Sequence, residues 1–118
     1  MLRPDEEIQV WLYSPAVDMR KSINGLSIIV EQELELSPMV HALFVFCNKR
    51  RDKIKLLYWE RNGFVLWYKR LEKQRFKWLK ADEDDVLCIT GAELNRLLDG
   101  LDIFYQKPHK SLFYDSMT

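Results

Sequence analysis

Three segments rich in β-branched and aromatic residues follow one another in the middle of the chain, separated by short loops. They span residues 43–47, 53–60 and 64–71. Asn62-Gly63 joins the second segment to the third and is the strongest short hairpin signal, so we expect Arg61 to pair with Phe64 across a two-residue turn. The segments therefore predict a three-stranded antiparallel meander at the centre of the fold.

Alternation along these strands divides their side chains between two faces. The face expected to be core collects Ile54, Leu56, Tyr58, Val65, Trp67 and Leu71. A five-residue loop then places Phe44 and Phe46 of the first strand opposite Leu56 and Ile54, on the same core face. The other face collects Lys53, Lys55, Leu57, Trp59, Tyr68 and Arg70.

The flanking segments predict further strands and two helices. Residues 8–13 alternate as a strand, and apolar positions at three-to-four-residue spacing predict a helix over 19–34. Phe76 and Trp78 suggest a short strand, and residues 86–89 predict another. Thr90 and Glu93 form a T-x-x-E capping box before a second helix that runs to Gly100.

These elements predict an α+β fold. We expect a curved antiparallel sheet of four to six strands containing the central meander, with one long helix packed on it and a short C-terminal helix closing one end of the core. The 118 residues suit a single domain, with a core over about 8–104 and a loosely ordered tail over 105–118.

Composition argues against several classes of protein. No apolar run approaches the ~18 residues that span a bilayer, and the first ten residues carry four charges, so we expect a cytoplasmic protein. Cys47 and Cys88 lack the spacing of a disulfide framework or a zinc site. We expect no cofactor, no metal and no catalytic site, and interpret the acidic run 82–85 as a solvated loop and His41 and His109 as surface residues.

Charge is unevenly distributed although its sum is zero. Residues 49–80 hold twelve basic and three acidic side chains, whereas the segments before and after them are acidic. A basic surface can neutralise several DNA phosphates and release their counterions, and Trp59 and Tyr68 could stack on unpaired bases. The alternative is that the aromatic residues pack under the first helix and the lysines keep the sheet edges soluble.

A family resemblance rests on strings spread along the chain, among them D-M-R-K at 18–21, R-D-K-I-K at 51–55 and L-W-Y-K-R-L-E at 66–72. Over residues 8–104 the chain resembles the TnpB (Orf2-like) accessory proteins of the sixty-six-type bacterial insertion sequences. Gln74 and Leu79 depart from the glycine and proline expected there. The resemblance implies a non-catalytic protein encoded beside a larger transposase, which carries the catalytic acidic triad.

The leading interpretation is therefore a DNA-binding accessory protein that acts with this transposase. The residues expected to contact DNA are Arg20, Lys21, Lys49, Arg50, Arg51, Lys53, Lys55, Trp59, Tyr68, Lys69, Arg70, Lys73, Arg75 and Lys77. Lys69 is expected to project from the opposite sheet face, and the position of Arg20 and Lys21 relative to the hairpin is left open. The alternative is a module that docks onto the transposase without binding DNA, and a metal-dependent nuclease is a distant third.

Overall fold

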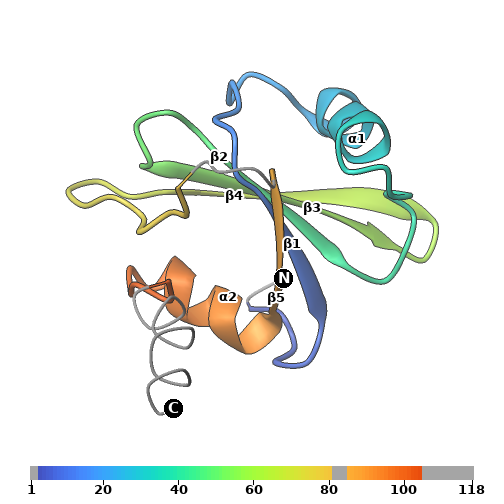
Figure 1. The fold of residues 1–118 in the computed structure, drawn as a ribbon. Coiled ribbons are helices and arrows are strands. Elements are labelled where there is room, and N and C mark those ends of the chain that lie inside the picture. The colour runs from blue at the N-terminus through green and yellow to red at the C-terminus, as the bar shows by residue number, and fades with distance from the viewer. Residues whose placement is uncertain (1–2, 81–84, 105–118) are drawn as a thin grey trace, which may run out of the picture.

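A five-stranded sheet with one helix on each face makes up the fold of the computed structural model, which describes residues 3–80 and 85–104 (Figure 1). The sheet has the strand order β4-β3-β2-β1-β5. In chain order the elements are β1 (Gln9–Tyr13), α1 (Ile23–Gln32), β2 (Leu43–Cys47), β3 (Lys53–Glu60), β4 (Gly63–Arg70), β5 (Val86–Thr90) and α2 (Gly91–Leu98). The fold class is α+β, as expected.

The sheet is mixed, so the expectation of a wholly antiparallel sheet was wrong. β1 runs parallel to β2, whereas the pairs β1–β5, β2–β3 and β3–β4 are antiparallel. The chain leaves β1, crosses one face of the sheet through α1 and enters β2 in the same direction, as a parallel pair requires. The helix is also shorter than the expected 19–34, since it spans ten residues.

β2 is buried on both faces, which divides the interior into two cores. All five of its side chains are buried. Phe44 and Phe46 pack with Leu26 and Val30 on the α1 side. The remaining β2 side chains pack on the α2 side, where the core includes Leu43, Val45, Cys47, Ile54, Leu56, Leu94, Leu97 and Leu98.

This arrangement corrects the expected register of β2 against β3. Phe44 and Phe46 lie opposite Leu57 and Lys55, one residue away from the positions expected for them. They therefore face α1 and not the core that contains Leu56. The shift follows from the apolar character of every β2 residue, because a strand buried on both sides gives no alternation to fix its register.

The β3–β4 hairpin turns one residue earlier than Asn62-Gly63 predicts. Gly63 pairs with Glu60, so Arg61 and Asn62 form the turn, and Trp59 lies opposite Phe64. The two rings meet edge to face with centroids 5.0 Å apart. Because the turn moves by one residue, the partner of each β3 residue moves by two positions along β4. Side chains two positions apart lie on the same face of a strand, so each side chain stays on its expected face.

The C-terminal elements follow local signals. The capping box is present, because the backbone N–H of Glu93 donates to Thr90 Oγ1 at 3.2 Å and that of Thr90 donates to Glu93 Oε1 at 3.1 Å. Phe76 and Trp78 do not form a strand. Phe76 is instead buried in the α2-side core, and Trp78 Nε1 donates to the carbonyl of Ser14 at 3.2 Å.

The start of α2 packs on the segment before β1. The backbone N–H groups of Gly91 and Ala92 donate to the carbonyl oxygens of Ile8 and Glu6, each at 3.0 Å. Gly91 is buried there, and a Cβ at this position would overlap the carbonyl oxygen of Asp5 and lie 3.0 Å from Ile8 Cγ2. The contact therefore requires glycine.

Two of the expected features lie outside the described residues: most of the acidic run, at 82–84, and the tail 105–118 with His109. Neither helix in the part of the chain described is long and apolar enough to cross a membrane.

Candidate nucleic-acid interface

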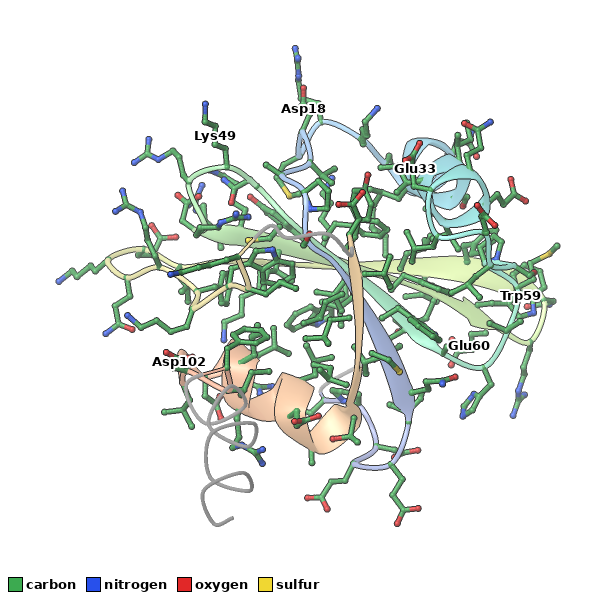
Figure 2. The ribbon with its side chains drawn as sticks, viewed as in Figure 1. Asp18, Glu33, Lys49, Trp59, Glu60 and Asp102 are labelled. Carbon is green, nitrogen blue, oxygen red and sulfur yellow. The ribbon has the colours of Figure 1, made fainter. Side chains whose placement is uncertain are left out.

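A hollow with a basic rim lies where the loop between β1 and α1 approaches the loop between β2 and β3. Figure 2 shows Asp18 and Lys49 on these two loops, on the same side of the sheet. The hollow has a volume of about 470 Å³. We call it the basic hollow, and its walls are Ala16, Val17, Asp18, Met19, Arg20, Asn48, Lys49, Arg50, Lys53 and Tyr68.

Asn48 fixes the shape of the β2–β3 loop. Its Oδ1 accepts hydrogen bonds from the backbone N–H groups of Asp52 (3.1 Å) and Lys53 (3.0 Å), and its Nδ2 donates to Asp52 Oδ1 at 2.7 Å. Arg51 completes the turn with a left-handed φ of 64°. The loop is thus held by its own hydrogen bonds and keeps Lys49 and Arg50 exposed at its tip.

The Asp52 carboxylate offsets part of the positive charge of the β2–β3 loop. The hydrogen bond from Asn48 is the main cause that lowers the pKa of Asp52, and Lys53 adds to the effect. Lys53 Nζ lies 3.4 Å from Asp52 Oδ1. Asp52 is therefore ionised at neutral pH and partly neutralises Lys53.

The β1–α1 loop carries a second ion pair. The Arg20 guanidinium donates to both carboxylate oxygens of Asp18, with Nη2–Oδ2 at 2.7 Å and Nε–Oδ1 at 3.2 Å. Hydrogen bonding to Arg20 lowers the pKa of Asp18 to about 2. The Arg20 side chain is nonetheless largely exposed, so this cation remains accessible at the rim of the hollow.

Lys55 ties the β1–α1 loop to the sheet. Its Nζ donates to the carbonyl oxygens of Met19 at 2.7 Å and Lys21 at 2.8 Å, and lies 5.8 Å from the centroid of the Tyr68 ring. The structure thereby places Arg20 and Lys21 on the same side of the sheet as the hairpin residue Lys55. Lys55 itself was expected to contact DNA, yet its ammonium donates to two carbonyl oxygens of the protein's own backbone.

The segment after β4 adds cations beside the β2–β3 loop. The backbone N–H of Leu71 donates to the carbonyl of Asp52 at 2.8 Å, and that of Phe76 donates to the carbonyl of Arg51 at 2.7 Å. These bonds hold residues 71–76 against the loop, and Lys73, Arg75 and Lys77 are exposed along this segment. We call the combined surface the basic end: Arg20, Lys21, Lys49, Arg50, Lys53, Arg70, Lys73, Arg75 and Lys77.

The basic end has few carboxylate partners among the residues that the structure describes. Asp18 pairs with Arg20, Asp52 with Lys53, and Glu72 with Arg70 at 2.9 Å. Within residues 3–80 and 85–104, no carboxylate lies within ion-pair distance of five other cations of the basic end, which are Lys49, Arg50, Lys73, Arg75 and Lys77. The surface is therefore strongly positive.

Three of the residues expected to contact DNA lie away from the basic end. Lys69 lies on the α2 face, as expected, where its Nζ donates to the carbonyl of Leu98 at 2.8 Å. Trp59 lies at the other end of β3, away from Lys49 (Figure 2). Arg51 is half-buried and turns back to the carbonyl of Asn48, at 3.4 Å from its Nη1.

The basic and aromatic residues expected on one sheet face do share that face, but they do not form one exposed surface. α1 covers the middle of that face, where Leu57 is buried beneath it. The cations gather at one end of the sheet, and Tyr68 is the aromatic side chain that lies with them. Sequence reasoning missed the role of Asn48, although asparagine is common in turns because its side chain hydrogen-bonds nearby backbone groups.

The arrangement supplies cations and one exposed aromatic ring, which suits binding of an anion. Among the described residues, no group of three or more histidine, cysteine or acidic side chains could hold a metal ion. His41 is exposed, as expected for a surface residue.

Comparison with known proteins gives a consistent result over most of the chain. The model of the family described as "IS66 Orf2 like protein" matches residues 8–108. The uncharacterized protein y4hO of Sinorhizobium fredii is 33% identical over 102 residues, which cover 86% of this chain and 88% of that protein. The protein y4jC of the same organism is 31% identical over 102 residues, covering 86% of each chain. No solved structure matches the chain.

Proposed function

The chain belongs to the IS66 Orf2-like family, and from this membership we propose that it assists transposition by binding DNA through the basic end. The family has an accessory role associated with insertion sequences. In the proposal the protein holds DNA while the transposase of the same element carries out strand cleavage and joining. Its own contribution is electrostatic and sequence-independent at the phosphates.

The observation that carries the proposal is the convergence of cations from three separate segments. They come from the β1–α1 loop, the β2–β3 loop and the segment after β4. Backbone hydrogen bonds and the bonds from Lys55 Nζ to two backbone carbonyls hold these segments in place. Cations fixed on a shaped surface neutralise several neighbouring phosphates at once, whereas scattered cations that only aid solubility have no reason to converge.

The charge pattern also favours DNA over an acidic protein. Lys49 and Arg50 stand at the tip of a loop, and Lys73, Arg75 and Lys77 are exposed in the segment held next to it. Cations spread over a surface can contact several phosphates of one DNA backbone, while the core of a protein interface is usually depleted of charge.

The test is equilibrium binding of the full chain to duplex and single-stranded DNA from the element ends over a salt series. Lys49→Gln with Arg50→Gln removes two charges from the basic end. Each phosphate contact contributes about 0.9 to the slope of log affinity against log salt on duplex, so this variant should reduce the slope by about 2. Lys55 is left intact because its replacement would release the β1–α1 loop.

A matched control removes two charges elsewhere. Arg61→Asn with Arg96→Gln changes exposed cations in the hairpin turn and in α2, outside the basic end. This control should keep the wild-type salt slope. Equal slopes for the two double variants, or affinity too weak to show a salt slope, would overturn the proposal and direct the search to a docking surface for the transposase.

A further inference from the structure

Tyr68 is an unusual residue for the place it occupies. Tyr68 is 48% exposed in the wall of the basic hollow, whose other exposed lining residues are mostly charged. It belongs to β4, an outer strand of the sheet, and lies opposite Lys55 of β3. An aromatic ring left open to solvent among cations is a candidate contact surface for a ligand that is both anionic and aromatic.

The ring is held in position by its neighbours. The Lys55 ammonium lies 5.8 Å from the ring centroid and is itself fixed by the carbonyl oxygens of Met19 and Lys21. A cation at this distance attracts the ring electrostatically. Tyr68 is thus restrained before any ligand arrives, which reduces the entropy lost on binding.

The hollow has the size and charge for one nucleotide. Its volume of about 470 Å³ falls in the range of small-ligand sites, roughly 300–1,000 Å³. Lys49, Arg50 and Lys53 stand around it as partners for flanking phosphates, together with Arg20, whose carboxylate partner Asp18 also lines the wall. Intact duplex keeps its bases stacked, so it can meet these cations but cannot bring a base face against Tyr68.

We propose that the basic hollow receives an unpaired nucleotide whose base stacks on Tyr68, so that the protein prefers single-stranded DNA to duplex. This inference rests on the proposed DNA-binding function and names the form of DNA that the same site takes. Asn48 Nδ2 and Oδ1 form hydrogen bonds within the β2–β3 loop, so the contact that the proposal assigns to the base is stacking on Tyr68. The preference is therefore for unpaired structure and tolerates different sequences.

The test measures binding of the full chain to a short single strand and to a hairpin duplex of the same sequence, both fluorescently labelled, for the wild type and Tyr68→Leu. Loss of one base–aromatic stack corresponds to a weakening of roughly 5- to 150-fold. We expect this loss for the single strand and little change for the duplex. Tyr68→Phe keeps the ring and should keep the preference.

Phe64→Leu is the matched control, because it makes the same aromatic-to-leucine change on the same strand and face, at the end far from the hollow. It should leave both affinities unchanged, and thermal unfolding of each variant checks that the fold is intact. Salt-dependent binding that Tyr68→Leu leaves unchanged, or weakens equally for both DNA forms, overturns this inference while the proposed function stands. Absence of binding to either form overturns both.

Discussion

Replacing Gly91 by alanine should have two opposite effects on stability: it raises the helix propensity of α2, and it disrupts the contact between α2 and the segment before β1. Helix propensity alone predicts a gain of up to about 1 kcal/mol for Gly→Ala inside a helix. In the structure, a Cβ at this position would overlap the carbonyl oxygen of Asp5, which also accepts a hydrogen bond from the backbone N–H of Ile8 at 3.3 Å. The segment before β1 would have to move away from α2.

That movement has a cost that can be estimated from its parts. It breaks the hydrogen bonds from the Gly91 and Ala92 N–H groups, worth about 1 kcal/mol each, and overpacking typically adds about 1–3 kcal/mol. After the gain in propensity is subtracted, we expect Gly91→Ala to lower the free energy of unfolding by about 2–4 kcal/mol. With a urea m-value of about 2 kcal/mol/M, the midpoint should fall by about 1–2 M.

Urea unfolding followed by tryptophan fluorescence measures this shift, and Gly63→Ala is the control. No atom lies within 4 Å of a Cβ built at Gly63, so that variant should be as stable as the wild type or gain up to about 1 kcal/mol. A midpoint for Gly91→Ala equal to or above the wild-type value would refute the packing of the N-terminal segment on α2.

Three further predictions concern single side chains. Thr90→Ala removes the N-cap of α2 and should reduce the free energy of unfolding by about 1 kcal/mol, measured by urea unfolding. Lys69→Met removes the hydrogen bond to the carbonyl of Leu98 and should also lower the free energy of unfolding by about 1 kcal/mol. The salt dependence of DNA binding should stay at the wild-type value, which a salt titration would check. Cys88 is exposed and should react with a thiol reagent in the native state at pH 8. Burial raises the pKa of Cys47 to about 11, so Cys47 should react only after unfolding. A timed thiol assay on the native and the unfolded protein would distinguish the two cysteines.

The parts of the fold that depend on local interactions could be predicted from the sequence. The T-x-x-E box located the start of α2 at Thr90, because both of its hydrogen bonds form within one turn. The division of β3 and β4 side chains between two faces was also correct, since it depends only on the alternation of the strands.

The register and the second core depend on contacts between distant segments. The turn at Arg61-Asn62 departs from the Asn62-Gly63 signal, and this register puts Trp59 opposite Phe64 and Lys55 opposite Tyr68. A continuous apolar run such as L-F-V-F-C in β2 is typical of a strand covered on both sides. That signal could have predicted helices on both faces.

The site could be predicted as a set of residues but not as a surface. Charge counts identified the basic segment, and its loops do converge at one end of the sheet. Lys55 and Lys69 look alike in the sequence, yet both are directed to backbone carbonyls by the packing around them. Which cations remain accessible depends on the partners that the fold places beside each one.

The position of β1 between β2 and β5 has a consequence for the order of assembly during synthesis. β3 pairs with the strands before and after it in the chain, so these pairings close short loops and are available once residue 70 has emerged from the ribosome. β1 pairs with β5, and Gln9 meets Thr90 across 80 intervening residues. The first strand to leave the ribosome therefore cannot complete its hydrogen bonds until β5 has followed it, so the sheet closes only after β5 has emerged.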